Sequence, residues 1–213
     1  QRIRIGSLEP RVVTTQTAKR LAAQPKVCPH FHLSLQSGCD ATLRRMNRHY
    51  TTGEYYASVE ALREAYGNPA ITTDVIVGFP GETEEEFKAT EAFLQKVGFY
   101  EMHIFKYSKR AGTVAAGMKE QIPEPVKTER SAELLKLEKE QSDSFRRKYI
   151  GQKAQVLLEE EKEYKGTRWL LGHTADYVRV AVPAEEGLGL NTLVDVKVSG
   201  FLEEDVLQGT TLP

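Results

Sequence analysis

Cysteine is scarce in this chain, and neither sign of charge is in excess. Two cysteines among 213 residues cannot build a disulfide scaffold, so we expect a protein of the reducing cytoplasm. No apolar run approaches the roughly 20 residues that span a bilayer, and the first residues do not resemble a signal peptide, which argues against a membrane protein. The formal net charge of -1 means that only a local basic patch would attract nucleic acid.

Composition and charge divide the chain into two parts. Hydrophobic residues make up 40% and charged residues 28%, as in folded globular proteins, and the length fits one large or two unequal domains. Residues 1–149 carry a net charge of +4 and residues 150–213 one of -5. The residue pattern changes at the same place, which predicts two domains, 1–149 and 150–213.

The first part alternates short apolar runs with helix-like stretches. The expected strands cover 2–7, 30–35, 71–77 and 100–107, and the expected helices cover 14–23, 41–46, 54–66, 84–97 and 123–149. This alternation predicts an α/β fold with parallel strands and right-handed crossovers. Four such units are too few for an eight-stranded barrel, so we expect a partial (βα) barrel.

Short strands separated by polar turns replace this pattern after Gly151. They are expected at 155–159, 169–174, 177–182 and 193–201. Such spacing is typical of a small antiparallel β-barrel of the OB-like kind.

The segment from Asp74 to Glu82 carries the sharpest chemical signal. Asp74 interrupts an apolar strand, where an unpaired carboxylate is costly. It therefore needs a donor, either neighbouring backbone or a sugar hydroxyl of a ligand. Gly78 and Gly81 follow the strand and would let a ligand approach the backbone, since ligands bind at the carboxyl ends of parallel strands.

Polar residues also end two earlier strands. Gln36 and Ser37 follow one of them, and Glu9 follows another. On the strand before Gln36, one face is predicted to hold Cys28, His30 and His32, but without a second ligand pair we expect these to be core residues rather than a metal site.

A basic stretch follows Gly38. It is either a solvated helix face or a clamp for a ligand carboxylate, and it comprises Arg44, Arg45, Arg48 and His49.

Five motifs, which occur one after another along the chain, together resemble those of the radical S-adenosylmethionine (SAM) methylthiotransferases that modify tRNA. They are Ser7-Leu-Glu-Pro, His32-Leu-Ser-Leu-Gln-Ser-Gly, Met46-Asn-Arg-His-Tyr-Thr, Thr73-Asp-Val-Ile-Val-Gly-Phe-Pro-Gly-Glu-Thr and Phe105-Lys-Tyr-Ser-Lys-Arg-Ala-Gly-Thr. The first and last are most similar to the branch that acts on threonylcarbamoyladenosine at tRNA position 37. The isopentenyladenosine branch typically has Ser-Pro-Arg-Pro-Gly-Thr in place of Ser108-Lys-Arg-Ala-Gly-Thr.

The resemblance implies a partial (βα)6 barrel that binds SAM and a [4Fe–4S] cluster and adds a methylthio group to C2 of an adenine. By motif, Glu9 and Arg48 would lie near the methionine moiety of SAM, and Gln36 with Ser37 and Asp74 near its ribose. Phe105 and Tyr107 would line the adenine or substrate side. The resemblance also implies that the end of the chain is a TRAM domain, an RNA-binding barrel.

The cysteines depart from this family. Its cluster is held by a Cys-x3-Cys-x2-Cys run that this chain lacks, and Cys28 and Cys39 have another spacing. We therefore expect the C-terminal part of such an enzyme, inactive alone, with an N-terminal part of the same polypeptide missing, no metal ligands and no catalytic residue within the chain.

The expected partner is the tRNA anticodon loop. A basic edge of the barrel would contact RNA through Lys162, Lys165 and Arg168, while Trp169 is either a stacking platform or a core residue. Three alternatives remain open: action on isopentenyladenosine tRNA, a nucleic-acid-binding module without catalysis, and a porphyrin-pathway oxidase with the same Gly-Phe-Pro-Gly turn.

Overall fold

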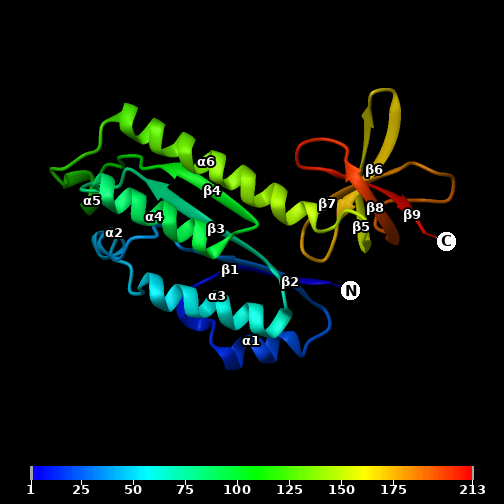
Figure 1. The fold of residues 1–213 in the computed structure, drawn as a ribbon, viewed down its shortest axis with the longest axis horizontal. Helices are drawn as coiled ribbons and strands as arrows, with labels where there is room; N and C mark the ends of the chain where they lie inside the picture. The colour runs from blue at the N-terminus through cyan, green and yellow to red at the C-terminus, as the bar shows by residue number, and fades with distance from the viewer. Residues whose placement is uncertain (1, 213) are drawn as a thin grey trace.

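The computed structural model describes residues 2–212, which form a four-stranded sheet and a separate closed barrel (Figure 1). The sheet has the order β1-β2-β3-β4, and every pair in it is parallel, as the alternating pattern predicted. Its strands are β1 (Ile3–Leu8), β2 (Val27–Leu33), β3 (Ala70–Val77) and β4 (Glu101–Lys106).

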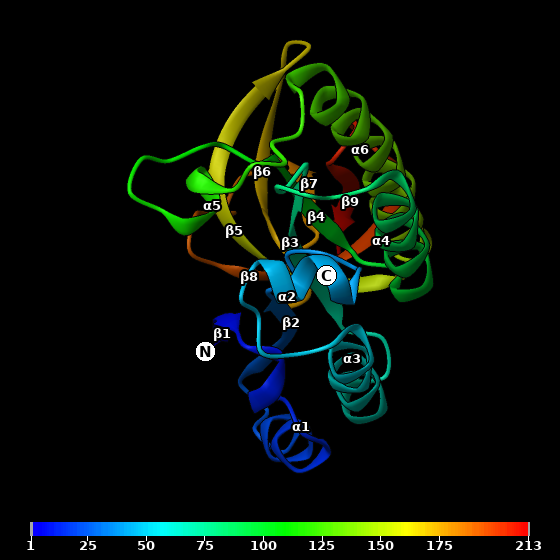
Figure 2. The same cartoon turned by 90° about the vertical axis from the view of Figure 1, so that its left-hand side faces the viewer.

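Four helices follow one side of this sheet, and the opposite side is not covered by any of these four (Figure 2). They are α1 (Thr15–Ala22), α3 (Thr52–Tyr66), α4 (Glu84–Val97) and α6 (Glu124–Arg147). The bounds of α4 agree with the prediction because Thr83 forms a capping box with Glu86 and Gly98 ends the helix with a φ of 63°.

Side chains alternate between the two faces of the sheet. On β3, Val75 and Val77 point to the helix side and are fully buried there, together with Phe31 and Leu33 of β2. The intervening Asp74 and Ile76 belong to the opposite face, which these four helices leave open. This open face is therefore the place where the sheet presents polar side chains.

Three short elements follow strand ends or precede α6. They are a 3-10 helix, η1 (Pro10–Val12), and the short helices α2 (Asp40–Arg45) and α5 (Val114–Gly117). Within residues 2–212, none of the helices is long and apolar enough to cross a bilayer.

Five strands form the closed barrel, in the order β5-β6-β7-β9-β8. They are β5 (Lys153–Tyr164), β6 (Thr167–His173), β7 (Arg179–Pro183), β8 (Leu193–Phe201) and β9 (Leu207–Thr211). A five-stranded closed barrel is the OB-like arrangement that the sequence predicted. One pair departs from the antiparallel pattern, because β7 and β9 run parallel to close the barrel.

The barrel packs against the amino-terminal ends of the sheet strands (Figure 1). Arg2 and Arg4, at the start of β1, donate four hydrogen bonds of 2.9–3.0 Å to barrel carbonyls. Ala70, Tyr100 and Phe145 join the apolar core of the barrel itself. Because the loops after the strands lie at the opposite end, the barrel sits far from the predicted ligand-binding end.

Candidate functional site

A cavity of about 540 Å³ opens on the uncovered face of the sheet, near the carboxyl ends of β3 and β4. This volume lies within the range of small-molecule sites. The structure brings four predicted site residues to its wall, namely Gln36, Asp74, Phe105 and Tyr107; the remaining lining residues are Ile76, Lys106, Ser108, Arg110, Thr113 and Ala115.

Gln36 is fixed to β3 by its own backbone. Its N–H donates to the carbonyl of Asp74, its carbonyl accepts from Ile76 N–H, both at 2.9 Å, and its φ of 71° is unusual for a residue other than glycine. The side chain is therefore presented beside Asp74 by a constrained turn rather than by a mobile loop.

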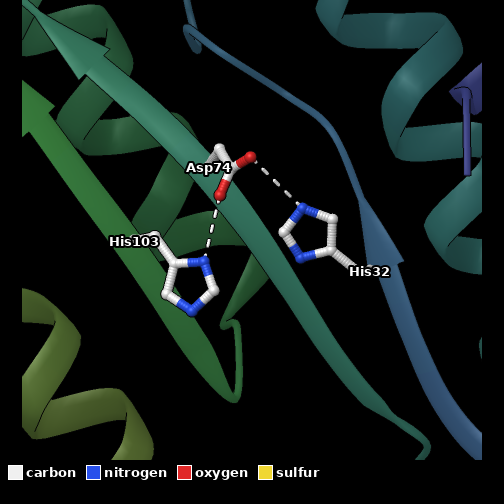
Figure 3. A group of neighbouring side chains, drawn as sticks. All are labelled: His32, Asp74 and His103. Atoms are coloured by element: carbon white, nitrogen blue, oxygen red, sulfur yellow. Dashed lines mark hydrogen bonds and ion pairs between the residues drawn. The ribbon is translucent and has the colours of Figure 1, made fainter. Parts of the chain in front are cut away.

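Asp74 is held between two histidines from the neighbouring strands (Figure 3). Its Oδ1 lies 3.0 Å from Nδ1 of His103, and its Oδ2 lies 3.4 Å from Nε2 of His32. The other ring nitrogen of His32 is 3.0 Å from Oγ1 of Thr72. These imidazoles are the donors that a carboxylate within an apolar strand requires, and the sequence interpretation did not include His103.

Aromatic side chains form another wall of the cavity. Phe105 is 52% exposed, although it belongs to a sheet strand. Tyr107 packs edge-on against Phe79, and its buried hydroxyl has no hydrogen-bond partner among the described residues. The exposed ring of Phe105 offers a stacking surface for a planar ligand.

Glu9 and Arg48 lie outside the cavity wall, and the charges of both act on the hydroxyl of Tyr50. Tyr50 donates to the carbonyls of Ser34 and Leu35, both at 2.9 Å. Burial raises the pKa of Tyr50 to about 12, while the Arg48 charge lowers it and the Glu9 charge raises it. The charges of Glu9 and Arg48 therefore act on the segment after β2, next to Gln36, but neither side chain lines the cavity.

Two expectations about this region differ from the structure. Ser37 is fully buried, with its hydroxyl 3.2 Å from Thr90 Oγ1, so it supports α4 and does not reach the cavity. Gly78 has a φ of 72°, and a Cβ there would lie 2.1 Å from the Lys127 side chain. Gly78 thus serves a turn packed on α6 and not the approach of a ligand.

The described residues offer one group with metal-ligand chemistry, which is His32, Asp74 and His103, with ligand atoms within 4.8 Å of one another. Of Cys28, His30 and His32, which the sequence predicted to share a face, only His32 belongs to this group. Cys28 is buried and His30 packs against Tyr177 of the barrel. The contacts of Asp74 with the two imidazoles account for the observed group without a cation.

The three predicted RNA contacts lie on or beside the β5–β6 hairpin, and two of them are already paired. Lys162 lies 3.3 Å from Glu203, and Arg168 contacts Glu161 at 2.6 Å. Lys165 has its ammonium over the Tyr164 ring, 5.0 Å from the centroid. Trp169 is 7% exposed and packs in a small apolar cluster with Leu171, Ala181 and Val206, beside the barrel core, so its ring is not free to stack on a base.

Comparison with known families bears on this geometry. Residues 2–94, which include β1 to β3 and Asp74, match the Radical SAM superfamily. In folds with parallel strands and crossover helices, ligands bind at the carboxyl ends of the strands, where the cavity lies.

Curated relatives match the radical SAM segment and continue beyond it into the barrel. The chain is 37% identical over 199 residues to threonylcarbamoyladenosine tRNA methylthiotransferase MtaB of Bacillus subtilis, covering 93% of this chain and 44% of that protein. It is 41% identical over 198 residues to tRNA-2-methylthio-N(6)-dimethylallyladenosine synthase of Aquifex aeolicus, again covering 93% and 44%. The chain thus spans less than half the length of these relatives.

A solved structure supports the fold assignment. Coproporphyrinogen III oxidase of Escherichia coli, a radical SAM enzyme, aligns with a TM-score of 0.54 at 20% identity, over 67% of this chain and 32% of that one. At this identity the likeness concerns the fold alone. The expectation of a parallel sheet of the radical SAM kind is confirmed.

Proposed function

We propose that this chain is the C-terminal part of a tRNA methylthiotransferase that acts on threonylcarbamoyladenosine at position 37. The observation that carries the proposal is the cavity formed by Gln36, Asp74, Phe105 and Tyr107 on the open face of a radical SAM sheet. The similarity to tRNA methylthiotransferases over 93% of the chain supports the reaction class.

The residues of the cavity fit SAM. Asp74 and Gln36 offer acceptors for the two ribose hydroxyls, and the exposed ring of Phe105 offers a stacking surface for adenine. Arg48 and Glu9, beyond Gln36, have the charges that a methionine carboxylate and ammonium require. Ser37 is left out of this site because its hydroxyl is engaged with Thr90. Bound SAM supplies, on reductive cleavage, the radical chemistry for methylthiolation.

The residues of this chain do not fit a [4Fe–4S] cluster. Such a cluster needs three thiolates if one iron is to remain for the cofactor, and the chain has two cysteines. Cys28 is buried and Cys39 precedes α2. The proposal therefore assigns the cluster to a longer polypeptide of which this chain is part, and we expect the chain alone to be inactive.

The barrel after residue 150 is proposed to be a TRAM domain that contacts the anticodon arm through Lys162, Lys165 and Arg168. A base within a single-stranded loop leaves its stack at low cost, so the adenine can enter the cavity while the barrel contacts phosphates. A cytoplasmic location follows from the tRNA partner.

The test is a deletion of the coding sequence in the organism that carries it, followed by mass spectrometry of nucleosides from total tRNA. We expect loss of the 2-methylthio derivative of threonylcarbamoyladenosine and accumulation of its unmodified form. The intact gene should restore the modification, whereas a copy encoding Asp74→Ala should not.

Two other results would redirect the proposal. Loss of the dimethylallyladenosine derivative instead would place the protein in the other branch, which is favoured by the relative from Aquifex aeolicus. Unchanged levels of both nucleosides would leave a nucleic-acid-binding module without this catalysis.

A further inference from the structure

We propose that His32 and His103 are positioning residues, which hold the Asp74 carboxylate in the orientation that receives the two ribose hydroxyls of SAM. This inference rests on the proposed function, and it assigns a role to two side chains that do not line the cavity themselves. Their contacts with Asp74, from strands on either side, carry the argument (Figure 3).

The three side chains come from three adjacent strands with a fixed register. Asp74 of β3 lies directly opposite His103 of β4, and His32 of β2 is paired with Thr72 of β3. Each imidazole takes a different oxygen of the carboxylate, and the two rings lie 5.8 Å apart and nearly parallel. A carboxylate contacted from both sides cannot rotate freely about its terminal torsion.

The hydrogen-bond roles follow from the partners. An ionised carboxylate only accepts, so the nitrogen of His103 that faces Asp74 must carry a proton. A neutral His32 that carries its proton on Nε2, facing Asp74, has an acceptor at Nδ1, and the Thr72 hydroxyl 3.0 Å away can donate to it. A doubly protonated ring also has a proton on the nitrogen that faces Asp74, so this nitrogen still donates. Both nitrogens therefore act as donors toward the carboxylate.

The carboxylate keeps acceptor capacity for a ligand. An ionised carboxyl group has about four lone-pair sites, and the two imidazoles occupy two of them. The side chain of Asp74 remains 30% exposed and lines the cavity next to Gln36. The two remaining lone-pair sites match the two O–H donors of a ribose diol. Because the histidines fix the orientation of the carboxylate, they also fix the direction in which these two sites point.

The same geometry separates this role from that of a metal site. A metal would need unprotonated nitrogens directed at a shared point. Here Nδ1 of His103 and Nε2 of His32 face different oxygens of Asp74 at 3.0 and 3.4 Å, as expected for donors.

The experiment compares two double variants of the 213-residue chain. In His32→Gln/His103→Asn, each amide nitrogen replaces the imidazole nitrogen that faces Asp74, so the donors are kept. In His32→Met/His103→Leu, the donors are removed at similar volume. Asp74→Asn tests the proposed ribose contact itself, and His49→Asn is a control at an exposed histidine.

The probes are adenosine and 2′,3′-dideoxyadenosine, and their dissociation constants are measured by NMR titration. We expect the wild type and the donor-keeping variant to prefer adenosine by about tenfold or more, as for hydrogen bonds to a charged acceptor. The donor-free variant should lose this preference while its affinity for dideoxyadenosine and its melting temperature stay unchanged.

Each other outcome counts against a specific step. If Asp74→Asn loses the preference but the donor-free variant keeps it, the positioning role is wrong and the ribose site stands. If the wild type has no preference, the ribose site fails and the positioning role with it. Stoichiometric Co²⁺ binding that both double variants abolish would make the histidines metal ligands instead.

A second measurement does not depend on a stably folded variant. In ¹⁵N spectra of the wild-type imidazoles, His103 should carry its proton on Nδ1 and His32 on Nε2 at neutral pH. The opposite tautomer at His103 would overturn the inference, because that ring could not donate to Asp74.

Discussion

Arg130 of α6 forms a buried ion pair with Glu82, with 2.8 Å between Nη1 and Oε2. The same carboxylate oxygen accepts from Gly78 N–H at 2.7 Å, and the Arg130 Nη1 also donates to the Glu82 carbonyl. Burial raises the pKa of Glu82, and the guanidinium opposes that rise. One side chain thus closes the turn after β3 and attaches it to α6, close to the cavity.

Removal of Arg130 alone should be strongly destabilising, because Glu82 would then be a buried carboxylate without its cation. We expect Arg130→Met to lower the free energy of unfolding by about 3–5 kcal/mol in urea denaturation. The double variant Arg130→Met/Glu82→Gln should recover part of this loss. Lys136→Met, on the exposed side of α6, should stay within about 0.5 kcal/mol of wild type. A similar small effect of Arg130→Met would show that the pair does not hold the turn.

Local sequence patterns were sufficient to predict much of the fold. The bounds of α4 and β8 agree with the sequence prediction, since capping residues mark the helix and an alternating apolar run marks the strand. Strand β9 was missed because Leu207–Thr211 is short, contains a glycine and is mostly polar. It is a strand because it closes the barrel between β7 and β8, which is a tertiary requirement.

The site was predictable only in part, for a similar reason. Asp74 is a charged residue within an apolar strand segment, and Gln36 is a polar residue directly after one, so both can be recognised in the sequence. The role of His103 depends on the register of β3 with β4, which no local pattern encodes. The burial of Ser37 was not predictable, because a polar residue after a strand can turn to either side of the sheet, and here its hydroxyl lies 3.2 Å from Thr90 Oγ1 on the helix side.

His30 should make the stability of the protein depend on pH. Burial, followed by the charge of Arg4, lowers the pKa of His30 from 6.5 to about 4. Between these values the unfolded chain binds a proton that the folded chain does not, so stability is lost as the pH falls from about 6.5 to about 4. We expect His30→Phe to reduce the loss in unfolding free energy between pH 7 and pH 5 by up to about 2 kcal/mol.

The measurement for His30 is urea denaturation of both proteins at the two pH values, because contributions from other groups cancel in the difference. His49→Asn, at an exposed histidine, should behave as wild type. An identical pH dependence in wild type and His30→Phe would show that His30 titrates normally in the folded protein.

Gly172 is a packing requirement of the barrel. A Cβ at this position would lie 1.8 Å from the carbonyl oxygen of Leu157 on the paired strand β5, and backbone cannot move aside as a side chain does. We expect Gly172→Ala to lower the free energy of unfolding by about 3 kcal/mol or more. Gly200→Ala, where nothing lies within 4 Å, is the matched control and should be nearly neutral. Equal effects of the two substitutions, measured by thermal unfolding, would contradict this account.

The ion pairs of the β5–β6 hairpin lead to a prediction about RNA. If Lys162 and Arg168 contact phosphates, they must first leave Glu203 and Glu161, so these carboxylates compete with the RNA. We expect Glu161→Gln/Glu203→Gln to raise the affinity for a tRNA anticodon stem-loop. The slope of log affinity against log salt should steepen by up to about 0.7–0.9 for each cation released.

The control must change the charge without freeing a cation. Glu186→Gln does so, because Glu186 is exposed and forms no ion pair within residues 2–212. An equal gain in this control would mean that net charge alone governs binding. Conversely, Lys162→Ala/Lys165→Ala/Arg168→Ala should flatten the salt dependence, since phosphate contacts and their released counterions are lost together. An unchanged slope in this triple variant would move the RNA contacts away from the hairpin, for instance to Lys109 and Arg110, which form no ion pair within residues 2–212 and of which Arg110 lines the cavity.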